Sequence, residues 1–174
     1  KVLEEDKQKE IKAVINVLKN NSLNLVDGPH VKILEKKVAK IFGKKYGLMV
    51  NSGSSANLLS LASFNFKKGS EIITPTLTFS TTVSPIYQLG LIPHFIGVLE
   101  NKFIADTEQI EKCINKRTVA IMIPNLLGNI PKWEVIYKIA KKYNLKVIED
   151  SADTIGYLAV SYTHLRAHET PINR

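Results

Sequence analysis

The chain has 174 residues, of which 44% are hydrophobic, and a formal net charge of +8 at pH 7. This length and composition are typical of a globular chain that can bury one sizeable core. No apolar run approaches the ~20 residues that a membrane-spanning helix needs. The charged start of the chain also lacks the apolar block of a secretory signal. We therefore expect a cytoplasmic protein with no membrane partner.

The charge pattern and the cysteine count argue against a nucleic-acid-binding protein and against a disulfide-bonded or iron–sulfur protein. Lysines dominate the basic residues, in pairs such as Lys36-Lys37 and Lys141-Lys142, with no interleaved aromatic platform. A solvated lysine-rich surface explains this pattern better than a nucleic-acid site does, so no nucleic-acid partner is expected. Cys113 is the only cysteine. It therefore allows no intrachain disulfide and no cysteine cluster for an iron–sulfur centre in this stretch.

Helical and strand patterns alternate along the chain. In chain order we expect helix 4–19, helix 30–42, strand 46–51, helix 54–65, strand 70–74, helix 80–89, strand 92–96, helix 107–115, strand 118–123, helix 131–143 and strand 145–149. Strands that alternate with helices of about ten residues indicate an α/β fold. The expected architecture is a three-layer α/β/α sandwich with a mainly parallel sheet.

The first motif is a turn of small residues. The apolar run 46–50 has strand length and stops at Asn51-Ser52-Gly53, after which Ser54 or Ser55 can cap a helix. A helix N-terminus offers unpaired N–H groups and the positive end of a dipole, and a glycine lets the backbone approach an anion. The segment therefore suits a phosphate group, although a simple helix cap explains it as well.

The second motif is a strand that ends in carboxylates. Run 145–148 reads as a buried strand, and Glu149 and Asp150 follow at its carboxyl end. Open α/β sheets bind their ligands at that end of the strands. An aspartate there could pair with a protonated pyridine nitrogen and keep that nitrogen charged. The alternative is a carboxylate that caps the next turn.

The two motifs in this order resemble the fold-type I pyridoxal-phosphate enzymes, and among them the DegT-type sugar aminotransferase and dehydratase family. The resemblance runs from about Asp27 to Tyr157. Its segments are Asp27-Gly28-Pro29, Asn51-Ser52-Gly53-Ser54-Ser55-Ala56, Thr74-Pro75-Thr76-Leu77-Thr78-Phe79-Ser80-Thr81-Thr82, Ile123-Pro124-Asn125-Leu126-Leu127-Gly128-Asn129 and Glu149-Asp150-Ser151-Ala152-Asp153-Thr154-Ile155-Gly156. The resemblance implies that this stretch is part of the large domain of such a fold.

The resemblance also implies roles for individual residues. The cofactor would be pyridoxal 5'-phosphate or pyridoxamine 5'-phosphate. Gly53, Ser54 and Ser55 would hold its phosphate, Phe79 would cover one face of its ring, and Asp150 would pair with its ring nitrogen. These assignments follow from the matched motifs.

Two further residues are candidate cofactor ligands with open alternatives. Asn125 could reach the cofactor or the substrate, or it could cap its own loop. Asp153 could form a hydrogen bond near the cofactor, or it could cap the next turn. No metal site is expected. His164 and His168 have a spacing that two metal ligands on one helix face could share, but no third ligand is evident.

The details of both motifs favour one branch of the family. Ser54 and Asp153 stand where many of its aminotransferases have Thr and Gln or His. This is closer to enzymes that remove the 3-hydroxyl of a 4-keto-6-deoxy nucleotide sugar in lipopolysaccharide sugar biosynthesis. The alternative is a nucleotide-sugar aminotransferase of the same family, and a more remote one is an α/β domain that binds another phosphate ligand. The resemblance implies an amino donor such as glutamate and a homodimer.

The domain organisation expected from the sequence has three parts. Residues 1–26 form a helical segment, 27–157 a partial cofactor-binding domain, and 158–174 a tail that resembles translated vector sequence and has no match in the family. The resemblance places the Schiff-base lysine, or the histidine that replaces it, after the aspartate motif. The last lysine, Lys146, precedes that motif, so we expect the base beyond Arg174 and expect the chain to be a fragment without turnover.

Overall fold

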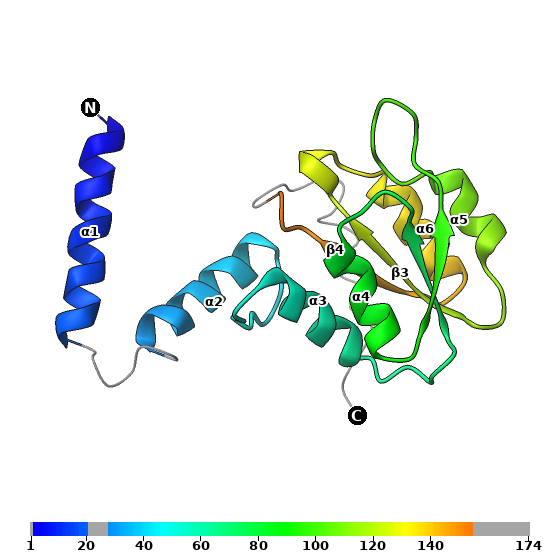
Figure 1. The fold of residues 1–174 in the computed structure, drawn as a ribbon, viewed down its shortest axis with the longest axis horizontal. Coiled ribbons are helices and arrows are strands. Elements are labelled where there is room, and N and C mark those ends of the chain that lie inside the picture. Colours follow the sequence, from blue (N-terminus) through cyan, green and yellow to red (C-terminus); the bar gives the residue numbers. More distant parts are fainter. Residues whose placement is uncertain (1, 21–27, 155–174) are drawn as a thin grey trace. The chain divides into compact units, whose positions relative to one another are not determined.

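The computed structural model describes residues 2–20 and 28–154 (Figure 1). The chain forms two compact units, Lys1–Met49 and Val50–Arg174, which are described separately below. The expected non-native tail at 158–174, with its two histidines, and residues 27 and 155–157 of the expected 27–157 domain lie outside the described residues.

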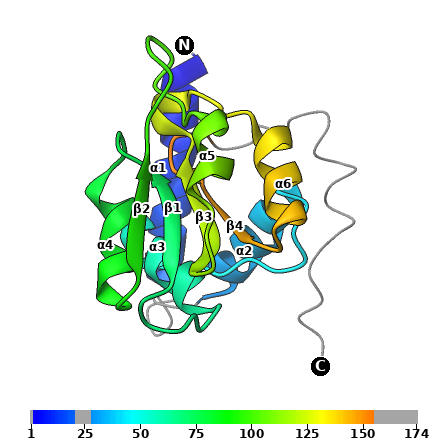
Figure 2. The same ribbon diagram turned by 90° about the vertical axis from the view of Figure 1, so that its right-hand side faces the viewer.

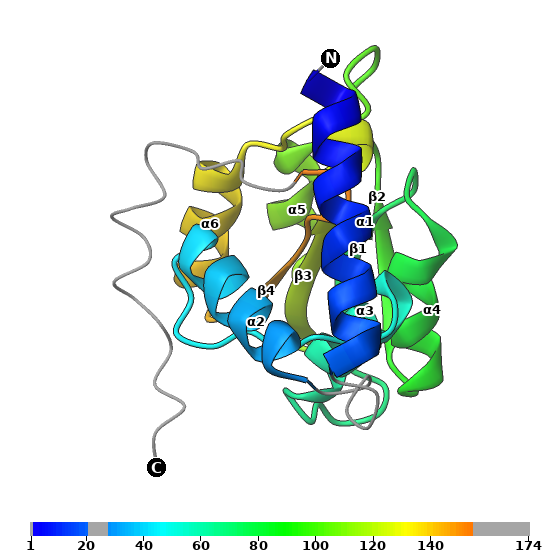
Figure 3. The same cartoon turned by 90° about the vertical axis from the view of Figure 1, so that its left-hand side faces the viewer.

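The first unit contains two helices, α1 (Val2–Asn20) and α2 (Pro29–Ile41), which are labelled in Figure 3. Both agree with the expected helices to within two residues at each end. Helix α2 begins at a proline because its fixed φ angle suits the first helical position, where no N–H partner is needed. It ends at Ile41, and Gly43 follows its C-cap residue, Phe42, with a φ of +58° that lets the chain turn away.

The expected strand at 46–51 is wrong, because the structure has no strand there. The Met49 N–H group donates to Glu35 Oε1 at 2.7 Å, and Tyr46 and Leu48 are 77% and 76% exposed. A strand needs a neighbour to take its backbone hydrogen bonds, and no strand in the described residues pairs with this segment. An apolar run shows that a segment can be extended, but not that a partner lies beside it.

The second unit is built on a parallel sheet of four strands. They are β1 (Glu71–Pro75), β2 (Ile92–Ile96), β3 (Thr118–Pro124) and β4 (Lys146–Asp150), in the spatial order β2-β1-β3-β4. All three pairings are parallel. In the β3–β4 pair, Pro124 lies opposite Asp150, so both strands end at the same level. The expected parallel sheet is confirmed.

Helices cover both faces of this sheet (Figure 2). Helices α3 (Gly53–Ala62) and α4 (Ser80–Gln88) lie on one face, and α5 (Thr107–Cys113) and α6 (Trp133–Lys142) on the other. A 3-10 turn, η1 (Leu126–Gly128), follows β3. The three-layer α/β/α architecture is therefore confirmed.

Each face of the sheet has its own apolar core. Because successive strand residues point to opposite faces, Ile72 packs with α3 and α4 while Ile73 packs with α5 and α6. Along β4 the same alternation places Ile148 on the α3/α4 face and leaves Val147 against the other core. Asp150, two residues after Ile148, therefore lies on the α3/α4 face, and this determines which helices can contact its carboxylate.

Candidate functional site

The N-terminus of α3 is capped by Ser52. Its Oγ accepts a hydrogen bond from the Ser55 N–H at 3.2 Å and donates one to Ser55 Oγ at 3.2 Å. The expectation that Ser54 or Ser55 caps the helix is therefore wrong. Ser52 has extended backbone angles, which direct its oxygen back over the first turn, whereas Ser54 and Ser55 already belong to the helix.

The first turn of α3 has the properties of an anion site. Among the described residues, no hydrogen-bond partner is found for the N–H groups of Gly53 and Ser54, and both residues are exposed. A Cβ atom placed on Gly53 would meet nothing within 4 Å, so neither packing nor a positive φ requires the glycine. The turn therefore combines open space with helix N–H donors and the hydroxyl groups of Ser54 and Ser55, a set that suits a phosphate.

Asp150 lies at the carboxyl end of β4, where it is half-buried. Its Oδ2 accepts hydrogen bonds from Asn57 Nδ2 at 2.8 Å and from Thr82 Oγ1 at 3.1 Å. Within the described residues, its Oδ1 accepts one long bond, from the Ala152 N–H at 3.3 Å. The carboxylate is thus held through one oxygen, which leaves the other with capacity for a ligand N–H group.

Asn57 and Thr82 were not identified from the sequence. Asn57 lies one turn into α3 and Thr82 in the first turn of α4, and both side chains are buried. The sequence did hold one sign of Asn57. It precedes the apolar Leu61 by four positions, so the two residues share a helical face, and a polar residue on a buried face needs a polar partner. The Asn57–Asp150 hydrogen bond connects α3, whose N-terminus suits an anion, directly to the carboxylate at the end of β4.

Asn125 lies on the opposite, α5/α6 face of the sheet and is only 2% exposed. Its Oδ1 accepts the indole N–H of Trp133 at 2.9 Å. Its Nδ2 faces three acceptors, namely Glu149 Oε1 at 2.8 Å, Ser151 Oγ at 3.1 Å and Thr154 Oγ1 at 2.9 Å. This side chain ties the end of β3 to the segment after β4, as a loop cap does, and contact with a cofactor stays a prediction.

Asp153 also joins the two strand ends. Its Oδ2 accepts the Leu127 N–H at 2.9 Å, and Leu127 has a φ of +53° in the turn after β3. A non-glycine residue in this left-handed region is uncommon and needs support from its surroundings. Asp153 supplies part of that support here, while a role beside a cofactor stays a prediction.

Phe79 stands immediately before α4, and the residue is 50% exposed. Its carbonyl oxygen accepts a hydrogen bond from the backbone N–H of Thr82 at 3.0 Å. Phe79 is thereby bonded to the residue whose side chain contacts Asp150. An exposed ring near the carboxyl end of a sheet is free to cover a flat ligand. Its stacking role stays a prediction.

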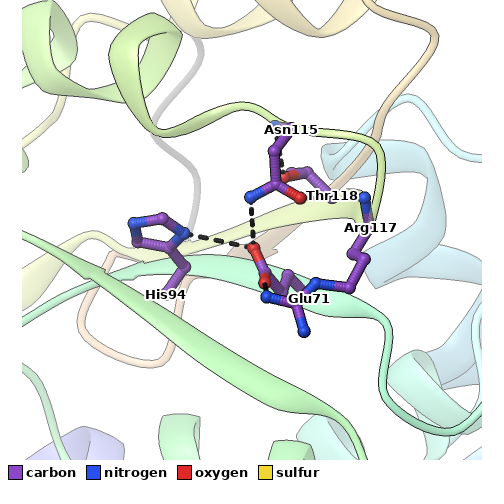
Figure 4. A network of polar contacts seen from close by, with 5 residues as sticks. All are labelled: Glu71, His94, Asn115, Arg117 and Thr118. Carbon is purple, nitrogen blue, oxygen red and sulfur yellow. Dashed lines mark hydrogen bonds and ion pairs between the residues drawn. The ribbon is translucent and has the colours of Figure 1, made fainter.

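A second polar cluster lies at the opposite, amino ends of the strands (Figure 4). Glu71, 3% exposed, accepts from Asn115 Nδ2 at 2.6 Å, lies 3.2 Å from His94 Nδ1 and forms an ion pair with Arg117. The Asn115 hydrogen bond is the largest cause that lowers the pKa of Glu71, opposed by burial and assisted by His94 and Arg117. The cluster joins β1, β2 and the start of β3, and we interpret it as structural.

Residues 2–20 and 28–154 contain neither a candidate metal centre nor a candidate membrane-spanning helix. No group of three or more His, Cys, Asp or Glu side chains is arranged to hold a metal ion. No helix in the same residues is long and apolar enough to cross a membrane.

A parallel α/β sheet with an open helix N-terminus and a strand-end carboxylate at one edge defines a ligand-binding domain of the doubly wound class. Residues 4–163 match the DegT/DnrJ/EryC1/StrS aminotransferase family. The chain therefore belongs to this family.

Individual relatives include both dehydratases and aminotransferases. The chain is 35% identical to GDP-4-keto-6-deoxy-D-mannose 3-dehydratase of Yersinia pseudotuberculosis over 86% of this chain and 39% of that protein. It is 36% identical to dTDP-3-amino-3,6-dideoxy-alpha-D-galactopyranose transaminase of Aneurinibacillus thermoaerophilus over 86% of this chain and 41% of that protein. The chain thus spans about two fifths of the length of these relatives.

A solved structure with a bound cofactor is also similar. The E. coli GDP-4-keto-6-deoxy-D-mannose-3-dehydratase with bound hydrated PLP aligns with a TM-score of 0.80 at 37% identity. The alignment covers 87% of this chain and 40% of that one.

Proposed function

We propose that this chain forms part of the large domain of a pyridoxal- or pyridoxamine-phosphate-dependent enzyme that removes the 3-hydroxyl of a 4-keto-6-deoxy nucleotide sugar. The pathway would be the synthesis of lipopolysaccharide or O-antigen sugars. The observation that carries the proposal is the Asn57–Asp150 hydrogen bond of 2.8 Å. This bond holds the Asp150 carboxylate, the proposed partner of the ring nitrogen, against the same helix whose first turn suits a phosphate.

The residues of the chain would divide the work of binding and orientation. The N–H groups of Gly53 and Ser54, with the Ser54 and Ser55 hydroxyls, hold the phosphate at the N-terminus of α3. Phe79 covers one face of the ring. Asp150 accepts a hydrogen bond from the protonated ring nitrogen on Oδ1, the oxygen that accepts one long bond, from Ala152, within the described residues. When bound, the cofactor supplies an electron sink for the carbanion that forms next to it.

The identity of the base that moves the proton would separate the two candidate reactions. A histidine in that role favours dehydration, and a lysine favours an aminotransferase, the alternative function within this family. Sequence identity does not separate them, because the dehydratase and the transaminase relatives are 35% and 36% identical to the chain. Glutamate is the proposed amino donor in either case.

We also propose that the whole protein is a cytoplasmic homodimer. Helix α1 carries an exposed apolar stripe at helical spacing, formed by Ile11, Val14, Ile15 and Leu18. Contiguous exposed apolar surface of this kind is typical of an interaction site. Light scattering of the full-length gene product should give twice the mass of one chain.

Product analysis tests the proposed reaction. The full-length gene product is incubated with pyridoxal phosphate, glutamate and a 4-keto-6-deoxy nucleotide sugar, and the sugar is analysed by mass spectrometry. A sugar that has lost one oxygen supports dehydration, and a sugar that has gained an amino group supports the aminotransferase. A protein that binds no pyridoxal or pyridoxamine phosphate would contradict both and favour the remote alternative, a domain for another phosphate ligand.

A further inference from the structure

Asn57 joins three parts of the second unit through one amide group. Its Nδ2 donates to Asp150 Oδ2 at 2.8 Å and to the Thr81 carbonyl oxygen at 3.3 Å. Both partners are acceptors, so the amide must present its NH₂ group to them, which settles its orientation. Asn57 is 7% exposed and thus has little access to water as an alternative partner.

Thr82 supplies the second donor to the same oxygen. Its Oγ1 lies 3.1 Å from Asp150 Oδ2, and the residue is fully buried in the first turn of α4. Helices α3 and α4 lie side by side on this face of the sheet (Figures 1 and 2). The two donors come from different helices and meet at one oxygen, so the carboxylate cannot rotate without losing buried hydrogen bonds.

We propose that Asn57 and Thr82 are positioning residues that fix the Asp150 carboxylate so that Oδ1 faces the ring nitrogen of the cofactor. The proposal rests on the proposed function, because it concerns the same site. Asn57 lies one turn from Gly53 on a rigid helix. It therefore also fixes the distance between the first turn of α3 and the Asp150 carboxylate. These are the groups that would bind the phosphate and the ring nitrogen of the cofactor.

The test compares two cofactors in the full-length gene product. One is pyridoxal phosphate. The other is deazapyridoxal phosphate, in which a C–H group replaces the ring nitrogen, so that it cannot use Asp150. Dissociation constants are measured by absorbance titration for the wild type, Asn57→Leu and Thr82→Val. Asn57→Leu keeps the approximate shape of the side chain but removes the amide donor, and Thr82→Val keeps the shape but removes the hydroxyl.

We expect each variant to bind pyridoxal phosphate about tenfold more weakly, the size of one hydrogen bond to a charged group. Binding of the deaza analogue should stay within about twofold of the wild type, because that cofactor does not depend on the orientation of the carboxylate. Thr82→Ser, which restores the hydroxyl, should restore the affinity for pyridoxal phosphate.

Thr118→Val is the matched control. Thr118 is also buried, and its Oγ1 accepts the Asn115 N–H at 3.0 Å, but it lies at the amino end of β3. This variant should lose stability without a preference between the two cofactors.

The possible results separate the positioning role from the proposed function. Equal losses for both cofactors, or no loss for either, would overturn the positioning role while leaving cofactor binding intact. A ring-nitrogen-specific loss in Thr118→Val would also overturn it. A wild-type protein that binds neither cofactor would overturn the proposed function, and the positioning role with it.

Discussion

Replacing Glu71 by glutamine should destabilise the protein at neutral pH and much less in acid. The Glu71 side chain is 4% exposed, and its carboxylate contacts Arg117, Asn115 and His94. Removing one partner of a buried ion pair costs about 3–5 kcal/mol. The Arg117 side chain is 65% exposed, which reduces the ionic part, and a glutamine oxygen retains one acceptor. We therefore expect a loss of about 2–3 kcal/mol in the free energy of unfolding.

The pH dependence follows from the direction of the pKa shift. Hydrogen bonding by Asn115, with help from His94 and Arg117, holds the pKa of Glu71 below its ordinary value of 4.5. The unfolded chain therefore takes up the proton first as the pH falls. The stabilisation from Glu71 is fully present above that ordinary value and is lost as the pH falls through the lower, folded-state pKa. The difference between wild type and Glu71→Gln should shrink accordingly.

Urea denaturation at pH 7 and at about pH 3 measures this difference without the ionic screening that guanidinium would add. Glu111→Gln is the control. The pKa of Glu111 is also lowered, chiefly by its hydrogen bond from Lys142, but this pair is exposed to solvent. Its substitution should have the smaller effect. A Glu71→Gln loss that is equal at both pH values, or no larger than that of Glu111→Gln, would contradict a stabilising role for the buried, ionised Glu71 carboxylate.

Three further outcomes are expected. Ser52→Ala should lower the stability by about 1 kcal/mol through loss of the α3 cap, and urea denaturation would detect it. Trp133→Phe should cost about 1–3 kcal/mol in the same assay, because it leaves the buried Oδ1 of Asn125 without its donor. In the full-length gene product, Asp150→Asn should lower kcat by orders of magnitude, since several kcal/mol of ring-nitrogen pairing would be lost. Steady-state kinetics that give a kcat within about twofold of wild type would contradict this role.

The sequence was sufficient to predict the class of fold, because the alternation of apolar periods is a local signal. Four of the five expected strands are present, and the residues that fill the two cores follow the strand period. The strand expected at 46–51 is absent, because pairing is not a local property. The cap was misplaced by two or three residues because serines at 52, 54 and 55 all suit that position chemically.

The two ends of the candidate site could be predicted from the sequence. Asp150 and the turn before α3 were recognisable because each ends or begins an element, and the resemblance assigned both to one cofactor. The residues that link them were not recognisable, since Asn57 and Asp150 are 93 positions apart and Thr82 and Asp150 are 68 apart. Such contacts depend on the side-by-side placement of α3 and α4 and on the face to which β4 directs its last residue. Neither of these is encoded in a short motif.

A crystal structure of the full-length gene product with pyridoxamine phosphate would test the central claim most directly. We expect the phosphate at the N-terminus of α3, against Gly53 and Ser54, and the ring nitrogen within hydrogen-bond distance of Asp150 Oδ1. We also expect Asn57 and Thr82 to remain on Oδ2, as they are here. A cofactor bound elsewhere, or a ring nitrogen that faces away from Asp150, would contradict the proposed cofactor site.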